Sequence, residues 1–321
     1  MQLRKFFLFS LIIAALLAAC NNQQPIDTSN PINFKHRTGV FSIQAPKSWV
    51  QTQDALPTET IAAFSDATHR AELIGYAGLL DHQLGDEEGL TAGSAILGGL
   101  LNQPTDLKIT DRSRRPDGSF TFAFTFTRAN APRSGSAIFR DADLSFSGVV
   151  INVASTEWPN LQTALQPYID SFKLNAEFVQ GTYFIPLDMK TFSVVVPADW
   201  AQQKTPRGDA VEVRSDSGKF SIIGAHKQMT ETLDEAGLAN QAPIVLKQAT
   251  KIDATLASSS KLPNGYLKVE LDRPDRHTVG YIEQKDGYFI GLFFDVPAAQ
   301  LSAYQPMIDF IVSTLVTGVI P

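Results

Sequence analysis

The strongest constraint on the fold of this 321-residue chain is that its sequence repeats itself once. The segment Phe41–Trp49 (FSIQAPKSW) is matched by Phe192–Trp200 (FSVVVPADW), and Gln166–Asp170 (QPYID) is matched by Gln305–Asp309 (QPMID). Shorter matches fall between them in the same order, and the spacing between the copies shortens slightly along the chain. An ordered series of this kind indicates two tandem homologous domains, and the length suits two domains of ordinary size.

Both copies show the same succession of predicted strands, a middle helix, further strands and a terminal helix. In the first copy, phenylalanines alternate with small or polar residues from Phe120 to Phe126, which is the period of a strand with one face in a core. In the second copy, Lys285-Asp286-Gly287 separates two apolar runs and predicts a tight hairpin. Successive strands joined by hairpins favour a largely antiparallel sheet.

The helices are predicted from their own patterns. The middle helices are expected at 86–102 and 231–247, although Gly93, Gly98 and Gly99 weaken the helical signal of the first. The terminal helices carry apolar stripes of helical period. Pro167 and Pro306 fall inside these stripes, so a kink or a restart of the helix is expected in both copies.

The first twenty residues have the pattern of a bacterial lipoprotein signal. Arg4 and Lys5 give a positive start, and an uncharged, largely apolar run of 14 residues, Phe6–Ala19, precedes Cys20, the single cysteine of the chain. The run has the length of a signal-peptide core and is shorter than the roughly 20 residues that span a bilayer. Leu17-Ala18-Ala19-Cys20 resembles the lipobox, which implies cleavage before Cys20 and attachment of acyl chains, such as palmitate, through its thiol. An ordinary secretory signal and an uncleaved anchor are the alternatives.

These features divide the chain into a signal peptide at 1–19, a flexible polar tether at 20–33, a first domain at 34–175 and a second domain at 182–318. A lipid at Cys20 would hold the mature protein on a bacterial membrane, at the outer face of the cell membrane or in the outer membrane. The net charge of −6 gives no support for nucleic-acid binding.

The strand that opens each copy resembles the start of the PsbP-like family, and the P-x-I-D pattern of the closing helices fits the same family. The residues that carry this resemblance are Phe41, Pro46 and Trp49 in the first copy and Phe192, Pro197 and Trp200 in the second. The resemblance implies an α+β fold, with two tandem α/β/α sandwich domains whose sheets are mainly antiparallel, and it brings no shared catalytic residues. Taken on their own chemistry, each proline ends its strand and each tryptophan packs against the edge of the sheet.

Candidate sites for chemistry are sparse. None of the five histidines stands at metal-ligand spacing, and the sequence contains no HExxH, CxxC, GxSxG, GxGxxG or P-loop motif. The densest polar cluster, at Asp81, His82, Asp86 and Glu87, is a weak candidate for a divalent cation and is better explained as a solvated helix start. The charged run Asp272–His277 is interpreted as a solvated hairpin tip, with a contact loop as the alternative. No metal and no cofactor is expected.

The sequence therefore favours a membrane-anchored, extracytoplasmic lipoprotein that acts as a non-catalytic binding or scaffolding module for an envelope protein partner. A solute-binding lipoprotein for a transporter is the first alternative, and it is disfavoured because such receptors usually alternate strands with helices. An envelope hydrolase is the second alternative, and it would need a histidine with aspartate and serine in hydrogen-bonding reach.

Overall fold

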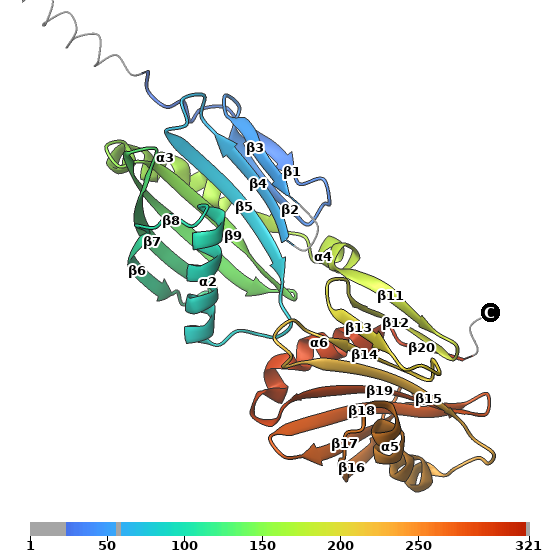
Figure 1. Cartoon of the computed structure of the whole chain (residues 1–321). Coiled ribbons are helices and arrows are strands. Elements are labelled where there is room, and N and C mark those ends of the chain that lie inside the picture. The colour runs from blue at the N-terminus through green and yellow to red at the C-terminus, as the bar shows by residue number, and fades with distance from the viewer. Residues whose placement is uncertain (1–23, 56–58, 319–321) are drawn as a thin grey trace, which may run out of the picture.

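A computed structural model describes residues 24–55 and 59–318, and it shows two domains that repeat one architecture (Figure 1). The elements of domain 1 are β1 (Pro31–Lys35), β2 (Phe41–Pro46), β3 (Val50–Ala55), β4 (Glu59–Ser65), β5 (Ala71–Leu79), α2 (Asp86–Leu100), β6 (Lys108–Arg114), β7 (Phe120–Arg128), β8 (Ala131–Ala142), β9 (Ser145–Ala154), α3 (Trp158–Asp170) and β10 (Lys173–Leu174). A linking helix, α4 (Ala176–Tyr183), follows. The elements of domain 2 are β11 (Phe184–Met189), β12 (Phe192–Pro197), β13 (Ala201–Lys204), β14 (Ala210–Arg214), β15 (Ser221–Gln228), α5 (Glu235–Thr250), β16 (Thr255–Lys261), β17 (Leu267–Arg273), β18 (Arg276–Lys285), β19 (Tyr288–Pro297), the short 3₁₀ helix η1 (Ala298–Gln300), α6 (Leu301–Ser313) and β20 (Val316–Thr317).

The two domains share one sheet topology. Domain 1 has a seven-stranded sheet in the order β3-β4-β5-β9-β8-β7-β6, and domain 2 has β13-β14-β15-β19-β18-β17-β16 in the same order. Each domain adds a three-stranded sheet, β1-β2-β10 or β11-β12-β20. The recorded strand pairs are antiparallel throughout, so the prediction of tandem α+β domains with antiparallel sheets is confirmed.

Each large sheet is packed on both faces. In domain 1, α2 covers the face that carries the four phenylalanines of β7, all of which are buried as the alternation predicts. Helix α3 and the small sheet cover the other face, and domain 2 repeats the arrangement with α5 on one face and α6 on the other. The glycines of α2 explain its closeness to the sheet, because a Cβ on Gly89 would lie 2.1 Å from Phe120 and one on Gly93 would lie 2.4 Å from Phe122. Residues with low helix propensity are thus required here for packing.

The domains are joined by contacts as well as by α4. The linking helix is itself bonded to domain 1, since the Tyr183 hydroxyl donates a hydrogen bond to the Ala77 carbonyl at 2.7 Å. The two domains meet directly where the Gln83 N–H donates a hydrogen bond to the Ala303 carbonyl at 2.8 Å. The apolar core on the α3 face of domain 1 is continuous with the core on the α6 face of domain 2. Domain 2 therefore packs directly against domain 1 and is connected to it by more than the linking helix.

One prediction about local structure is wrong, and a second, the kink or restart of the terminal helices, fails as to the restart. The tether does not extend to residue 33, because Ile26 is buried and the chain is held to domain 1 from there, with the Asp27 carbonyl accepting a hydrogen bond from Trp49 Nε1 at 2.9 Å. The terminal helices do not restart, because α3 runs through Pro167 and α6 runs through Pro306. The residues four positions earlier in each helix are exposed, so water can bind the carbonyl that each proline leaves unpaired.

The predicted signal peptide and Cys20 lie outside the described residues. Within 24–55 and 59–318, no helix is both long and apolar enough to cross a membrane.

Candidate functional site

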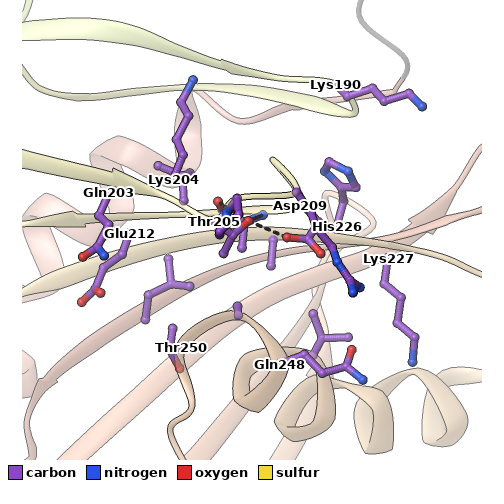
Figure 2. A pocket seen from close by; sticks show the side chains of 18 of the residues that line it. Lys190, Gln203, Lys204, Thr205, Asp209, Glu212, His226, Lys227, Gln248 and Thr250 are labelled. Atoms are coloured by element: carbon purple, nitrogen blue, oxygen red, sulfur yellow. Dashed lines mark hydrogen bonds between the residues drawn. The ribbon is translucent and has the colours of Figure 1, made fainter.

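A cleft of about 1050 Å³ opens in domain 2 where strands β13, β14 and β15 meet the C-terminal half of α5 (Figure 2). Its floor is apolar and is formed by residues of two strands and the helix, namely Ala210, Ile223, Ala225, Val245 and Ala249. Polar side chains surround this floor, and several of them, including Gln203 and Gln248, are exposed. A concave site with an apolar floor and a polar rim is a typical binding surface.

The rim of the cleft is basic. It carries Lys190, Lys204, Arg207, Lys227 and Lys251, which are five of the thirteen lysines and arginines in residues 184–318. Only two of the sixteen acidic residues in the same range, Asp209 and Glu212, lie there. In the described structure none of the five cations is in an ion pair, whereas six of the domain's other eight are. The cleft is therefore a positively charged patch on a chain of net charge −6.

The two acidic residues of the rim are already engaged. The Glu212 carboxylate is 2.7 Å from Arg214 Nη2, and the Asp209 carboxylate accepts a hydrogen bond from the Thr205 hydroxyl at 2.5 Å. Neither is paired with a rim cation in the described structure. The rim cations consequently keep their charge available to a ligand.

The duplicated topology allows the same position to be inspected in domain 1. Gly75 of β5 and Gly224 of β15 fix the register, since a Cβ on either would collide with the phenylalanine ring that opens the domain, at 2.8 Å from Phe41 or 2.5 Å from Phe192. The next residue along the strand is Tyr76 in domain 1 and Ala225 in domain 2. Both side chains lie on the face of their sheet that carries the middle helix, although α5 packs directly on β15 whereas α2 packs chiefly on β6, β7 and β8.

The neighbouring strand shows the same difference. Tyr76 is paired across the strands with Ile61, and Ala225 is paired with Ala210. Tyr76 is 3% exposed and packs edge-on against Phe139, at 6.3 Å between ring centroids. In domain 1, this place is therefore occupied by the side chains of Ile61 and Tyr76. In domain 2, the matching residues Ala210 and Ala225 leave it open.

On the other side of the strands the cleft contains a histidine. His226 lies edge-on to Tyr288 at 5.8 Å between ring centroids, and Lys190 Nζ is 5.6 Å from the centre of the same tyrosine ring. Burial lowers the pKa of His226, with Lys190 contributing in the same direction, so the ring is neutral at pH 7. Its Nδ1 is buried and has no hydrogen-bond partner in the described structure.

The residues that the sequence singled out lie elsewhere. Cys20 is outside the described residues. The six residues of the opening-strand pattern lie at or beside the ends of β2 and β12, where all six are buried: Phe41, Pro46, Trp49, Phe192, Pro197 and Trp200. The cleft escaped the sequence analysis because it is formed by small side chains, and only an alignment of Tyr76 with Ala225 could have revealed it.

The polar cluster before α2 is brought together only in part. His82 Nδ1 is 2.5 Å from the Asp81 carboxylate and His82 Nε2 is 2.9 Å from the Glu88 carboxylate. Asp86 is paired with Arg114, and in residues 24–55 and 59–318 no set of three His, Cys, Asp or Glu groups is placed to hold a metal ion. Hydrogen bonding to Asp81 raises the pKa of His82, and both nitrogens of the ring are already held by carboxylates.

This histidine also marks the contact between the domains. Its ring lies 4.8 Å from the ring of Tyr304, which belongs to α6 of domain 2 and is fully buried. Burial raises the pKa of Tyr304 to about 12, so its hydroxyl stays protonated. Asp81 and His82 therefore serve the domain interface in the described structure.

The charged hairpin tip between β17 and β18 is not simply solvated. Arg273 Nη1 is 2.7 Å and Arg276 Nε is 2.5 Å from the carboxylate of Asp295, which also accepts a hydrogen bond from Thr278 at 2.9 Å. The Asp295 side chain is only 5% exposed, so both arginines turn inward to balance a buried charge. The interpretation as a solvated tip is wrong for these two residues, because it did not foresee an acidic partner on β19.

A hydrolase would need a reactive triad, and the turn between β4 and β5 has the required residue types. Ser65 Oγ is 3.2 Å from His69 Nδ1. The Asp66 carboxylate, however, accepts hydrogen bonds from the backbone N–H of Ala71 and of Thr68, and these distances are 2.6 Å and 3.0 Å. A triad requires the carboxylate to orient the histidine, so these contacts describe a turn and not a catalytic arrangement.

Comparison with known proteins gives structural likenesses only. No protein-family model and no curated protein matches the chain. The solution structure of cyanobacterial PsbP from Synechocystis is similar with a TM-score of 0.37 and 14% identity, over 48% of this chain and 98% of the other. The Saccharomyces cerevisiae Ran-binding protein Mog1p gives a TM-score of 0.34 and 12% identity, over 46% and 98%. The immunity protein TplEi of Pseudomonas aeruginosa gives 0.23 and 10%, over 92% and 100%.

Proposed function

We propose that this chain is a lipid-anchored, non-catalytic binding protein outside the cytoplasmic membrane, and that it engages an envelope protein partner through the cleft of domain 2. One observation carries the proposal. The same fold occurs twice in the chain, and the matching strand positions carry Ile61 and Tyr76 in domain 1 but Ala210 and Ala225 in domain 2, where a cleft opens beside α5. An open site with an uncompensated charge is what a binding domain needs and what a purely structural copy does not need.

The arrangement of the domains supports a division of roles. The chain enters domain 1 at the end that lies away from domain 2 (Figure 1). With a lipid at Cys20, domain 1 would stand between the membrane and the cleft. Because domain 2 is seated on domain 1 through buried contacts, the cleft would be presented at a defined distance from the membrane surface.

The anchor is tested separately from the binding site. Growth of expressing bacteria with a clickable fatty acid should label the protein, and Cys20→Ala should abolish the label because the thiol is the attachment point. A labelled Cys20→Ala protein, or an unlabelled natural chain, would contradict the anchor and would leave the cleft untouched.

The binding role is tested by photo-crosslinking in cells. A photoreactive amino acid at Gln203 or Gln248, both exposed on the cleft rim, should give discrete products with an envelope protein. The same amino acid at Lys108, exposed on β6 of domain 1, is the matched control and should not give these products. Ala225→Tyr should remove the products from the cleft positions, since it supplies the ring that fills domain 1.

Ala225→Tyr is the direct test because it places at the cleft floor the residue that stands at the matching position of domain 1, Tyr76, whose ring there lies over Gly78 where domain 2 has Lys227. Circular dichroism and the melting temperature should show that the variant is folded. Products that persist in folded Ala225→Tyr, or that appear equally from Lys108, would refute the cleft as the binding site.

A further inference from the structure

We infer that the cleft of domain 2 receives an acidic peptide segment of the partner that carries a central aromatic side chain. This inference rests on the proposed function and specifies the chemistry of the partner. It follows from two independent features of the site, the shape of the floor and the distribution of charge around it.

The shape of the floor is defined by comparison with domain 1. There, the ring of Tyr76 is paired across the strands with Ile61, packs edge-on against Phe139 and is almost completely buried. In domain 2 both positions are alanine, while the flanking Ile223 and Val245 still provide apolar walls. The matching position of domain 1 thus carries an aromatic side chain of the chain itself, and the apolar floor of domain 2, with alanines in its place, has room for an aromatic ring from outside.

The cleft is larger than one ring. Its volume of about 1050 Å³ and its open rim leave room for the backbone on both sides of an inserted ring. A peptide segment suits this shape better than a compact solute does, since the floor takes one side chain and the rim follows the segment on either side.

The charges are spread and do not converge. Lys190 and Lys204 lie on one side of the strands, and Lys227 lies on the other side, beside the helix (Figure 2). A single phosphate-sized anion would need several donors aimed at one point, and this rim offers separate ones. A segment with acidic residues before and after the aromatic one would meet a cation on each side, and its charge would also steer it towards this patch.

The test uses the full chain in a neutral detergent and a short synthetic peptide with a central tyrosine flanked by two glutamates on each side. Fluorescence anisotropy of the labelled peptide should show saturable binding that weakens as salt is added. Two control peptides, one with alanine for tyrosine and one with lysines for the glutamates, should bind at least about tenfold more weakly, since each removes one of the two recognised features.

The variants address the same two features. Ala225→Tyr should weaken binding of the tyrosine peptide by at least about tenfold by occupying the floor. Lys227→Gln combined with Lys251→Gln should weaken it about three- to tenfold, as expected for two exposed charge contacts. The double change Lys108→Gln and Arg112→Gln on exposed β6 removes the same charge from domain 1 and should leave binding unchanged.

Several results would overturn the inference. These are equal binding of a control peptide, unchanged binding by folded Ala225→Tyr, or displacement of the peptide by inorganic phosphate, which would indicate a point anion site. If cleft crosslinks form in cells but the acidic peptide does not bind, the proposed function stands and the inference about the partner's chemistry fails. If neither is observed, both fail.

Discussion

Substitution of Asp295 by asparagine should destabilise domain 2 more than its single neutralised charge suggests. The carboxylate is 5% exposed and accepts charge-assisted hydrogen bonds from Arg273 at 2.7 Å and Arg276 at 2.5 Å, with Thr278 adding a third at 2.9 Å. Asparagine has nearly the same shape, so the change leaves no cavity. It removes the negative charge and places an N–H group towards one of the arginines.

The magnitude follows from the burial of the partners. Removing one member of a buried ion pair costs about 3–5 kcal/mol, because the remaining charge is left buried without compensation. The side chains of Arg273 and Arg276 are 18% and 24% exposed, so water relieves part of that cost, and we expect a loss near the lower end, about 3 kcal/mol. At about 2–4 °C for each kcal/mol in a domain of this size, the melting transition of domain 2 should fall by about 6–12 °C.

The assay is urea and thermal unfolding followed by circular dichroism, with Asp309→Asn as the matched control. Asp309 lies on an exposed turn of α6 and accepts one hydrogen bond from Gln305, so its substitution should change stability by no more than about 0.5 kcal/mol. The double variant Asp295→Asn with Arg276→Gln should be less destabilised than the sum of the two single variants, because each single change strands the partner of the other. An Asp295→Asn protein as stable as the Asp309→Asn control would refute the reasoning.

Three further predictions test other parts of the fold. The pKa of His82 is raised in the folded state, so its contribution to the unfolding free energy should be complete below its unfolded value of about 6.5 and lost as pH rises through the folded pKa. Urea unfolding at a series of pH values should show this difference between the natural chain and His82→Gln, and equal pH profiles would contradict it. Gly93→Ala should destabilise domain 1 by about 1–3 kcal/mol despite the better helix propensity of alanine, because its Cβ would meet Phe122. Gly99→Ala on the open side of α2 should be neutral or stabilising by up to about 1 kcal/mol. Thermal unfolding that ranks the two variants otherwise would exclude the packing role of Gly93. Asp234→Ala should cost about 1 kcal/mol in chemical unfolding, since its carboxylate accepts a hydrogen bond from the Gly237 N–H at the start of α5, and an unchanged midpoint would rule out this cap.

Much of the fold could be predicted from the sequence because it depends on patterns that repeat. The alternation from Phe120 to Phe126 corresponds to β7, and Lys285-Asp286-Gly287 forms the turn between β18 and β19, with positive φ at Asp286 and Gly287. The duplication predicted two domains of one topology, which the order of the strands confirms. What the sequence could not give is the effect of long-range contacts, such as the burial of Ile26 against domain 1.

The cleft belongs to this second class. No motif marks it, because its floor is made by the absence of side chains at Ala210 and Ala225, and its cations are scattered through the sequence from Lys190 to Lys251. Only the pairing of β14 with β15 and the placement of α5 bring them together. The cleft therefore corresponds to no catalytic or metal-binding motif in the sequence.

The duplication separates features that serve the fold from features that serve a function, because each domain is a control for the other. Asn152 of domain 1 and Asp295 of domain 2 stand at the same position of the central strand, three residues beyond the partners of Gly75 and Gly224. Asn152 lies beside the buried Arg133, and Asp295 lies beside the half-buried Arg276. This polar cluster is kept in both copies with different residues, as expected where the sheet end needs it for stability. The cleft shows the opposite pattern, because its floor positions carry Ile61 and Tyr76 in one copy and two alanines in the other, where the site is open and basic. A difference between two copies of one strand order cannot be a requirement of the fold, and it is the reason for our proposal that the binding site lies in the second copy.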